Sequence, residues 1–240
     1  GHGGNGPDDG VLRFKHGVTR EMVYESVDRP GRRALHARIA QHLRSRAVPT
    51  REVPHEALAY HLGAAGHTAD AAEHAEAAGD RAASLSAIDR AKSLYKLALR
   101  HRSALALGPG GGFLAALSAG ADSADGEDAD PLADPGRIAA RIAGRTAELN
   151  RRWLDIAHKL GPFCVFDASR KDLPLFERAV QLADAQPDAA LRARARYWRG
   201  YVLYALGQAP DAVTQCAEAA ALAPGDDWLA LDRNAFGESG

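Results

Sequence analysis

Residues 193–224 read ARARYWRGYVLYALGQAPDAVTQCAEAAALAP, and small residues recur in this stretch at fixed intervals. With Ala193 counted as position 1, positions 8, 15, 20, 27 and 32 hold Gly200, Gly207, Ala212, Ala219 and Pro224. Small side chains let two helices cross closely, glycine suits the turn after a helix, and proline stops a helix. The stretch therefore predicts a pair of closely packed helices.

These intervals resemble those of the tetratricopeptide repeat, a helix pair of about 34 residues that stacks on copies of itself. The stretch departs from the usual pattern because Arg196 and Arg199 replace Trp and Leu, and Cys216 replaces an aromatic residue. The resemblance implies an all-α fold, a tetratricopeptide-like right-handed α-solenoid. Looser, partly overlapping copies are marked by Gly66, Ala71 and Ala78, by Gly79, Ala91, Tyr95 and Ala98, and by Phe176 and Ala179.

The composition of the 240 residues also favours helices. Hydrophobic residues make up 46% of the chain but aromatic residues only 6%, and much of the apolar fraction is alanine, a strong helix former and a poor strand former. A net charge of -1 gives no field that would attract nucleic acid or an anionic membrane. Two cysteines without CxxC spacing, and no apolar run of about 18–20 residues, favour a cytoplasmic protein.

Apolar residues at helical spacing predict the other elements. Two short helices carry Val18–Val27 and Leu35–Leu43, and "GPFCVFDASRKDLP" (161–174) is interpreted as a turn. Residues 107–137, rich in Gly, Asp and Pro, are expected to form a flexible linker, with a short helix at Phe113–Leu117. Further helices are expected at about 55–65, 68–85, 87–105, 137–160, 173–185, 188–206 and 210–222, with one more starting near Trp228.

Three segments in the first half, FKHGVTREMVYESV (14–27), RRALHARIAQHL (32–43) and LAYHLGAAG (58–66), resemble one region of large bacterial signalling proteins. In those proteins a STAND-type ATPase module, which ends in a winged-helix subdomain, is followed by tetratricopeptide-like repeats. The implied organisation is a tag or disordered lead at 1–10, a short winged-helix remnant at 11–50, repeat-like helices at 51–106, the linker at 107–137 and repeat-like helices at 138–240.

The same resemblance implies a non-catalytic regulatory scaffold within a longer protein. Such modules occur with class III adenylate cyclase domains and with LuxR-type DNA-binding domains. The sequence HGVTREMVYESV (16–27) resembles the cyclase group more closely. The expected partners are a protein, a peptide or other domains of the same chain. A LuxR-type transcriptional regulator is the first alternative, and a stand-alone helical enzyme, which would need a polar pocket of converging titratable groups, is an alternative of another class.

His16 is the one residue to which the resemblance assigns a ligand. In STAND ATPases a winged-helix histidine at a strand-to-helix junction reaches the β-phosphate of the bound nucleotide, so ATP or ADP is implied for the longer protein. A helix N-terminus and an imidazole both favour a phosphate. The alternative is that His16 only caps the helix that follows it.

We expect no catalytic residue, cofactor or metal in this chain. The "GPGGGF" segment lacks the Lys-Ser/Thr of a phosphate-binding loop. The ten histidines form no HExxH motif, and His36 and His42 lie on different helix faces. The acidic run 122–130 lacks the ligand spacing of a calcium loop. The arginines of helix 31–45 lack interleaved aromatic residues, which favours a solvated face over nucleic-acid binding.

A candidate partner groove lies in the opening stretch. Positions 2, 5, 9 and 12 of a tetratricopeptide unit line its concave surface, and here they are Arg194, Tyr197, Tyr201 and Tyr204. The three tyrosines share one helix face, and tyrosine offers a large contact area and a hydroxyl group. The alternative is that this stripe packs on helix 173–185. We expect Tyr197 to pack on that helix, and Tyr201 and Tyr204 to line the groove.

Overall fold

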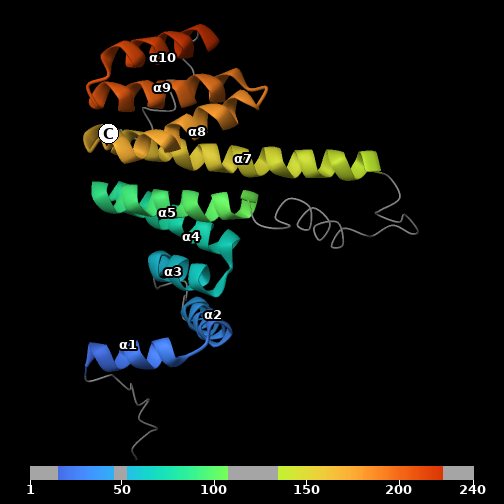
Figure 1. The fold of residues 1–240 in the computed structure, drawn as a ribbon, viewed down its shortest axis with the longest axis vertical. Helices are drawn as coiled ribbons and strands as arrows, with labels where there is room; N and C mark the ends of the chain where they lie inside the picture. The colour runs from blue at the N-terminus through green and yellow to red at the C-terminus, as the bar shows by residue number, and fades with distance from the viewer. Residues whose placement is uncertain (1–15, 46–52, 108–134, 224–240) are drawn as a thin grey trace, which may run out of the picture.

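The computed structural model describes residues 16–45, 53–107 and 135–223, and its fold is all-α, as predicted. The helices stack one after another along the long axis of the molecule (Figure 1). Every regular element in these ranges is helical: α1 (Gly17–Ser26), α2 (Arg29–Ser45), α3 (His55–Ala65), α4 (Thr68–Ser84), α5 (Ile88–Leu107), α7 (Pro135–Phe166), the 3-10 turn η1 (Arg170–Asp172), α8 (Leu173–Asp184), α9 (Ala189–Ala205) and α10 (Ala209–Leu222).

The turn predicted at 161–174 is wrong in its first part, because α7 continues through Gly161 and Pro162 to Phe166. Leu160 and Cys164 lie four residues apart and are fully buried, so packing against the core outweighs the local turn signal. The predicted linker also ends earlier than expected, since α7 begins at Pro135. The predictions for residues 1–15, 46–52, 108–134 and 224–240 lie outside the described residues.

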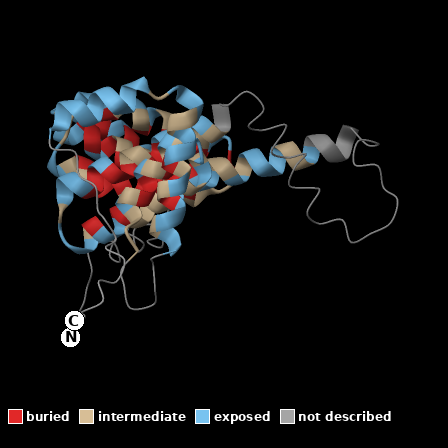
Figure 2. Cartoon of the chain, turned by 90° about the horizontal axis from the view of Figure 1, so that it is seen from below, coloured by how far each residue is buried: buried red, intermediate tan, exposed pale blue. Residues whose placement is uncertain are grey.

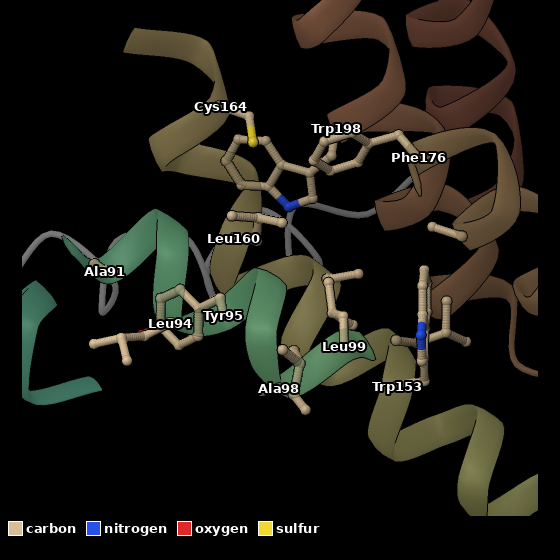
Figure 3. Packing of buried hydrophobic residues seen from close by; sticks show 14 of the residues in the cluster. Ala91, Leu94, Tyr95, Ala98, Leu99, Trp153, Leu160, Cys164, Phe176 and Trp198 are labelled. Carbon is tan, nitrogen blue, oxygen red and sulfur yellow. The ribbon is translucent and has the colours of Figure 1, made fainter. Parts of the chain in front are cut away.

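The main core lies where α7, α8 and α9 meet α5. Trp198 of α9 packs between Leu160 and Cys164 of α7 and Phe176 of α8 (Figure 3). Buried residues gather in the middle of the stack, whereas the first half of α7 projects from it with exposed and half-buried residues (Figure 2). A second, smaller cluster joins α2, α3 and α4 and consists of Ala40, Leu58, Leu62 and Ala71.

Glycines mark the closest helix crossings. A Cβ atom on Gly79 of α4 would lie 2.7 Å from the ring of Tyr95 on α5. A Cβ atom on Gly200 of α9 would lie 2.8 Å from Sγ of Cys216 and 3.2 Å from the carbonyl oxygen of Ala212 on α10. Both pairs of helices therefore approach at distances that any larger side chain would prevent.

Arg196, one of the departures noted in the opening stretch, links three helices. From α9 it donates to Asp184 at the end of α8, with Nη1–Oδ1 and Nη2–Oδ2 distances of 2.7 and 3.1 Å. Its Nε donates to Glu218 of α10 at 3.2 Å. One forked guanidinium therefore holds two carboxylates from neighbouring helices.

Among the described helices, none combines the length and the apolar character that crossing a bilayer requires.

Candidate functional site

The tyrosine stripe lies on α9, a helix with a well-defined beginning and end. The carboxylate of Asp188 accepts hydrogen bonds from the amides of Ala190 (2.9 Å) and Leu191 (3.3 Å), which caps the N-terminus. After the C-terminus, Gly207 adopts a left-handed conformation with φ of 78°. The stripe is therefore carried by a rigid helix whose other faces pack on α7, α8 and α10.

Along this stripe the tyrosines become progressively more exposed. Tyr197 is half-buried and packs against the main core, with its ring centroid 5.0 Å from that of Trp198 and 4.7 Å from that of Tyr201. Tyr201 is 40% exposed and Tyr204 is 70% exposed. The last two rings are thus open to a partner, while their role in a groove stays a prediction.

Arg194, at the start of the stripe, is directed towards α7. Its Nη1 lies 3.4 Å from Nδ1 of His158, a long contact in which arginine can only donate. His158 is buried, and burial together with the charge of Arg194 lowers its pKa to about 3. A neutral imidazole here accepts from Arg194, so this arginine has a contact within the chain in addition to any that a partner would offer.

His16 lies at the N-cap position of α1 and is exposed. Its backbone oxygen accepts from the amide of Arg20 at 3.3 Å, but its side chain makes no capping hydrogen bond. The imidazole therefore has no capping role in this structure, and its predicted contact with a nucleotide phosphate stays a prediction.

Two histidine pairs, which the sequence analysis did not find, join α3 to its neighbours. Nδ1 of His36 on α2 lies 2.8 Å from Nδ1 of His61 on α3, and Nε2 of His36 lies 2.9 Å from the hydroxyl of Tyr24 on α1. His55 of α3 and His74 of α4 form the second pair, with 2.9 Å between their Nδ1 atoms. The pairs connect residues 25 and 19 positions apart, so no local motif could reveal them.

Each pair requires at least one neutral imidazole, which accepts the hydrogen bond. An Nδ1–Nδ1 hydrogen bond needs one ring to donate and the other to accept, so it cannot form when both rings are protonated. Burial and the neighbouring His36 lower the pKa of His61. Burial, His55 and Arg44 lower the pKa of His74, although Asp70 and Glu73 oppose the shift.

A groove of about 970 Å³ opens beside these pairs, between α3, the second half of α4 and the start of α5. Ala78 and Ala82 of α4 contribute to its lining and are buried. Tyr60 of α3 and Leu85, which follows α4, also line it and are 62% and 68% exposed. The charged residues among its lining are Arg81, Arg90 and Glu56.

A buried cluster of opposite charges lies between α5 and the connection from α7 to α8. Nζ of Lys92 lies 2.8 Å from Oδ2 of Asp167 and 3.1 Å from Oδ2 of Asp172, and Lys96 pairs with the other oxygen of Asp172. Burial would lower the pKa of Lys92, but hydrogen bonds to the two aspartates outweigh it and the net shift is upward. A lysine held protonated is no nucleophile, so this cluster fastens helices together.

In the described part of the chain, no group of three or more His, Cys, Asp or Glu residues could hold a metal ion. Cys164 and Cys216 are both free, and burial raises the pKa of the Cys164 thiol to about 12. No protein-family model, curated protein or solved structure matches this chain. The candidate sites are therefore the tyrosine stripe on α9 and the groove beside α3.

Proposed function

We propose that this chain is a non-catalytic scaffold segment of a longer, ATPase-linked signalling protein, and that it binds a protein, a peptide or another domain of that protein. The observation that carries the proposal is the exposure of Tyr201 and Tyr204 on a helix whose remaining faces are buried. Tyrosines held on a rigid helix offer contact area at a small cost in conformational entropy, which suits recognition.

A tetratricopeptide-like, right-handed solenoid is the architecture that we propose for it. The proposal is supported by the close crossings at Gly79 and Gly200, which lie where the repeat requires small residues. It is also supported by the order of contacts, in which α9 packs on α10 and on both α7 and α8.

We propose that α1 and α2 are the remnant of a winged-helix subdomain. Val18, Met22 and Val23 of α1 are all exposed, and α1 buries no residue. An apolar helix face of this kind is normally covered, and the rest of a winged-helix subdomain would cover it. We assign the longer protein to the cytoplasm and favour an adenylate cyclase as its output, with a LuxR-type regulator as the alternative.

The partner surface is tested by replacing Tyr201 and Tyr204 with Ala and measuring binding to the separately expressed remainder of the longer protein by calorimetry. A groove role predicts lost binding with a decrease in the free energy of unfolding below about 1 kcal/mol, because both rings are exposed. A decrease of about 3–5 kcal/mol would instead indicate a packing role. Val213→Ser, at an exposed position on α10, is the control that should bind normally.

The assignment to a longer protein is tested by the coding sequence on either side of this chain. A GxxxxGK[ST] loop upstream supports the ATPase, and a cyclase or helix-turn-helix domain identifies the output. Turnover of ATP to cyclic AMP by the isolated chain would show that it is itself an enzyme and would overturn the scaffold proposal.

A further inference from the structure

The joint between α2 and α3 is small and separate from the main core. Of α2 only His36 and Ala40 are buried, and Ala40 belongs to the second cluster, which shares no buried residue with the main core. Arg44 adds an ion pair to Asp70 of α4 at 2.7 Å, but both side chains are nearly half exposed, so the pair stabilises the joint little. A segment held by so few buried groups can open while the main core stays intact.

His36 is the buried polar residue of this joint, and both of its ring nitrogens are engaged. With neutral rings, the hydroxyl of Tyr24 donates to Nε2 of His36 (2.9 Å), and Nδ1–H of His36 donates to Nδ1 of His61 (2.8 Å). One added proton is tolerated, because a protonated His36 donates from both nitrogens, to His61 and to the oxygen of Tyr24. A second added proton is not, since two N–H groups would then face each other at 2.8 Å.

The charges around this hydrogen bond do not favour a second proton. Tyr24 of α1 carries the guanidinium of Arg32 5.5 Å from its ring centroid. Tyr60 of α3 lies edge-on to His36 and His61, at centroid distances of 5.7 and 5.1 Å. Beside His61, the charged residues that line the groove are Arg81 and the ion pair of Arg90 with Glu56, with 3.0 Å between Nε and Oε2. The one carboxylate in this set already pairs with an arginine, so it does not balance a second imidazolium.

The pair of His55 and His74 adds a response of the same sign between α3 and α4. Its Nδ1 atoms lie 2.9 Å apart, so it too tolerates one added proton and not two. Facing His74 are Arg44 of α2 and, on α4 itself, Asp70 and Glu73. Burial lowers the pKa of His74, His55 and Arg44 lower it further, and the two carboxylates do not reverse the shift. Mild acid therefore weakens the contacts of α3 on both sides.

The direction of the pH response follows from the folded pKa values. Burial, and next the charge of His36, lower the pKa of His61 below the usual 6.5. Burial and Arg100 likewise lower the pKa of His101, which packs on α3 at Gly63. A histidine with a lowered pKa takes up a proton more readily once it is released. The closed joint is thus favoured above about pH 6.5 and is lost progressively as pH falls below that value.

We propose that the joint between α2 and α3 is a switch that mild acid opens: once His36 and His61 both carry an added proton, their hydrogen bond is lost and α2 separates from α3. α1 leaves with α2, because Tyr24 joins it to His36 and it buries no residue of its own. In the longer protein proposed above, this opening loosens the N-terminal part from the helical stack. That consequence rests on the proposed function, whereas the opening itself does not.

The opening is measured on the full chain by hydrogen–deuterium exchange with mass spectrometry, from about pH 7.5 to about pH 5, with rates corrected for the intrinsic effect of pH. Once released, α2 is a marginal helix that exchanges quickly, since it has 17 residues and carries Pro30 and Gly31 near its start. We expect the protection of α2 to fall about tenfold or more relative to that of α9, because a group held neutral contributes about tenfold per pH unit. Equal changes in α2 and α9 overturn the proposal.

Single substitutions assign the response to the histidine pair. In His61→Asn the side-chain oxygen accepts from Nδ1–H of His36 whether that ring is neutral or protonated, so the protection of α2 relative to α9 should stay within about twofold down to about pH 5. His42→Asn, at an exposed position on the same helix, is the matched control and should respond as the unaltered chain does. A loss in His61→Asn as large as in the unaltered chain, or no loss in His42→Asn, contradicts the switch.

A second variant and a second measurement cover the case in which His61→Asn leaves α2 unprotected even at about pH 7.5. His36→Asn then takes its place, because its amide can donate to His61 or accept from it. NMR spectra of the ring nitrogens in the unaltered chain need no variant. Protonation of both His36 and His61 as α2 loses protection supports the switch. Two protonated rings beside a protected α2, or an unprotected α2 while one ring stays neutral, overturn it.

The comparison with α9 separates this switch from an effect of acid on the whole chain. His158, whose pKa is also lowered, lies against Arg194 of α9, so a loss of stability that it causes appears in α9 as well as in α2. The outcome is equally independent of the proposed partner surface. Tyr201 and Tyr204 take no part in the joint, so failure of their binding test leaves the exchange result unchanged.

Discussion

The indole ring of Trp198 on α9 packs so closely on Gly161 of α7 that a Cβ atom at position 161 would lie 2.2 Å from Cδ2 of the ring. Two further ring atoms would lie within 2.7 Å of it. The ring cannot move aside easily, because Leu160, Cys164 and Phe176 surround it in the core (Figure 3). Gly161 is therefore the residue that lets α9 approach α7.

Gly161→Ala should lower the free energy of unfolding by about 1–3 kcal/mol, measured by urea denaturation. Alanine normally stabilises a helix interior relative to glycine, so a loss has to come from the contact with Trp198. Gly144→Ala is the control in the same helix, because a Cβ atom there meets nothing within 4 Å. It should stabilise the chain by up to about 1 kcal/mol, and a similar gain at Gly161 would contradict the close packing.

Gly200→Leu should cost about 2–4 kcal/mol, since the new side chain meets Cys216 and the backbone of Ala212. Ala205→Leu, at an exposed position near the end of the same helix, should change the stability little. The two variants are compared by thermal and urea unfolding. An unchanged midpoint for Gly200→Leu would show that α9 and α10 do not cross there, and the repeat count from Ala193 would fail with it.

The helices could be predicted well because alanine-rich apolar stripes at helical spacing are strong local signals, and α3, α8 and α10 lie within a residue or so of their expected ranges. Gly161 and Pro162 misled the prediction for the opposite reason. They are strong local breakers, yet the burial of Leu160 and Cys164 keeps the chain helical through them. That burial depends on Trp198, which lies more than thirty residues away.

In the candidate sites, too, contacts between residues far apart in the sequence could not be predicted from local patterns. The positions of Tyr201 and Tyr204 on one helix face followed from their spacing, but the sequence could not say which rings α7 and α8 would cover. The contact between Arg194 and His158 and the two histidine pairs join different helices, so they required the tertiary structure.

Asp172→Asn should lower the free energy of unfolding by about 3–5 kcal/mol, because Lys92 and Lys96 would lose a buried carboxylate partner. Asp184→Asn is the control. Asp184 is exposed and Arg196 retains Glu218, so the loss there should stay below about 1 kcal/mol. Equal losses in the two variants would show that the Lys92 cluster does not stabilise the fold.

The same cluster predicts a dependence on pH. Burial would raise the pKa of Asp172, but hydrogen bonds from Lys96 and Lys92 outweigh it, so the pKa is lowered in the folded chain. A depressed carboxyl pKa stabilises the fold above the pKa of the unfolded state, about 4, and the stabilisation is lost as pH falls through the folded value. Asp172→Asn should therefore lose less stability than the unaltered chain as pH falls below about 4.

His158 should make the chain sensitive to milder acid. In the unfolded state it takes up a proton near pH 6.5, whereas the folded pKa is lowered to about 3, so unfolding is favoured as pH falls between these values. Its contribution is about 1.4 kcal/mol per pH unit. His158→Leu should flatten the decline in the free energy of unfolding between about pH 6 and pH 4.5. Identical slopes would show that His158 is protonated in the folded chain.

The contacts that α4 and α5 make with the α7–α8 region indicate that an unbroken backbone is not needed to hold the two parts together. Lys92 reaches Asp167, Lys159 reaches Glu76 at 2.7 Å, and the indole of Trp153 donates to Ser103 at 3.0 Å. Each of these pairs joins residues on opposite sides of the segment 108–134, and the shared core does the same. We expect that the chain, if divided within this segment into two polypeptides, reassembles when the two are co-expressed. The two parts could then serve as a split protein, in which assembly reports that both are present.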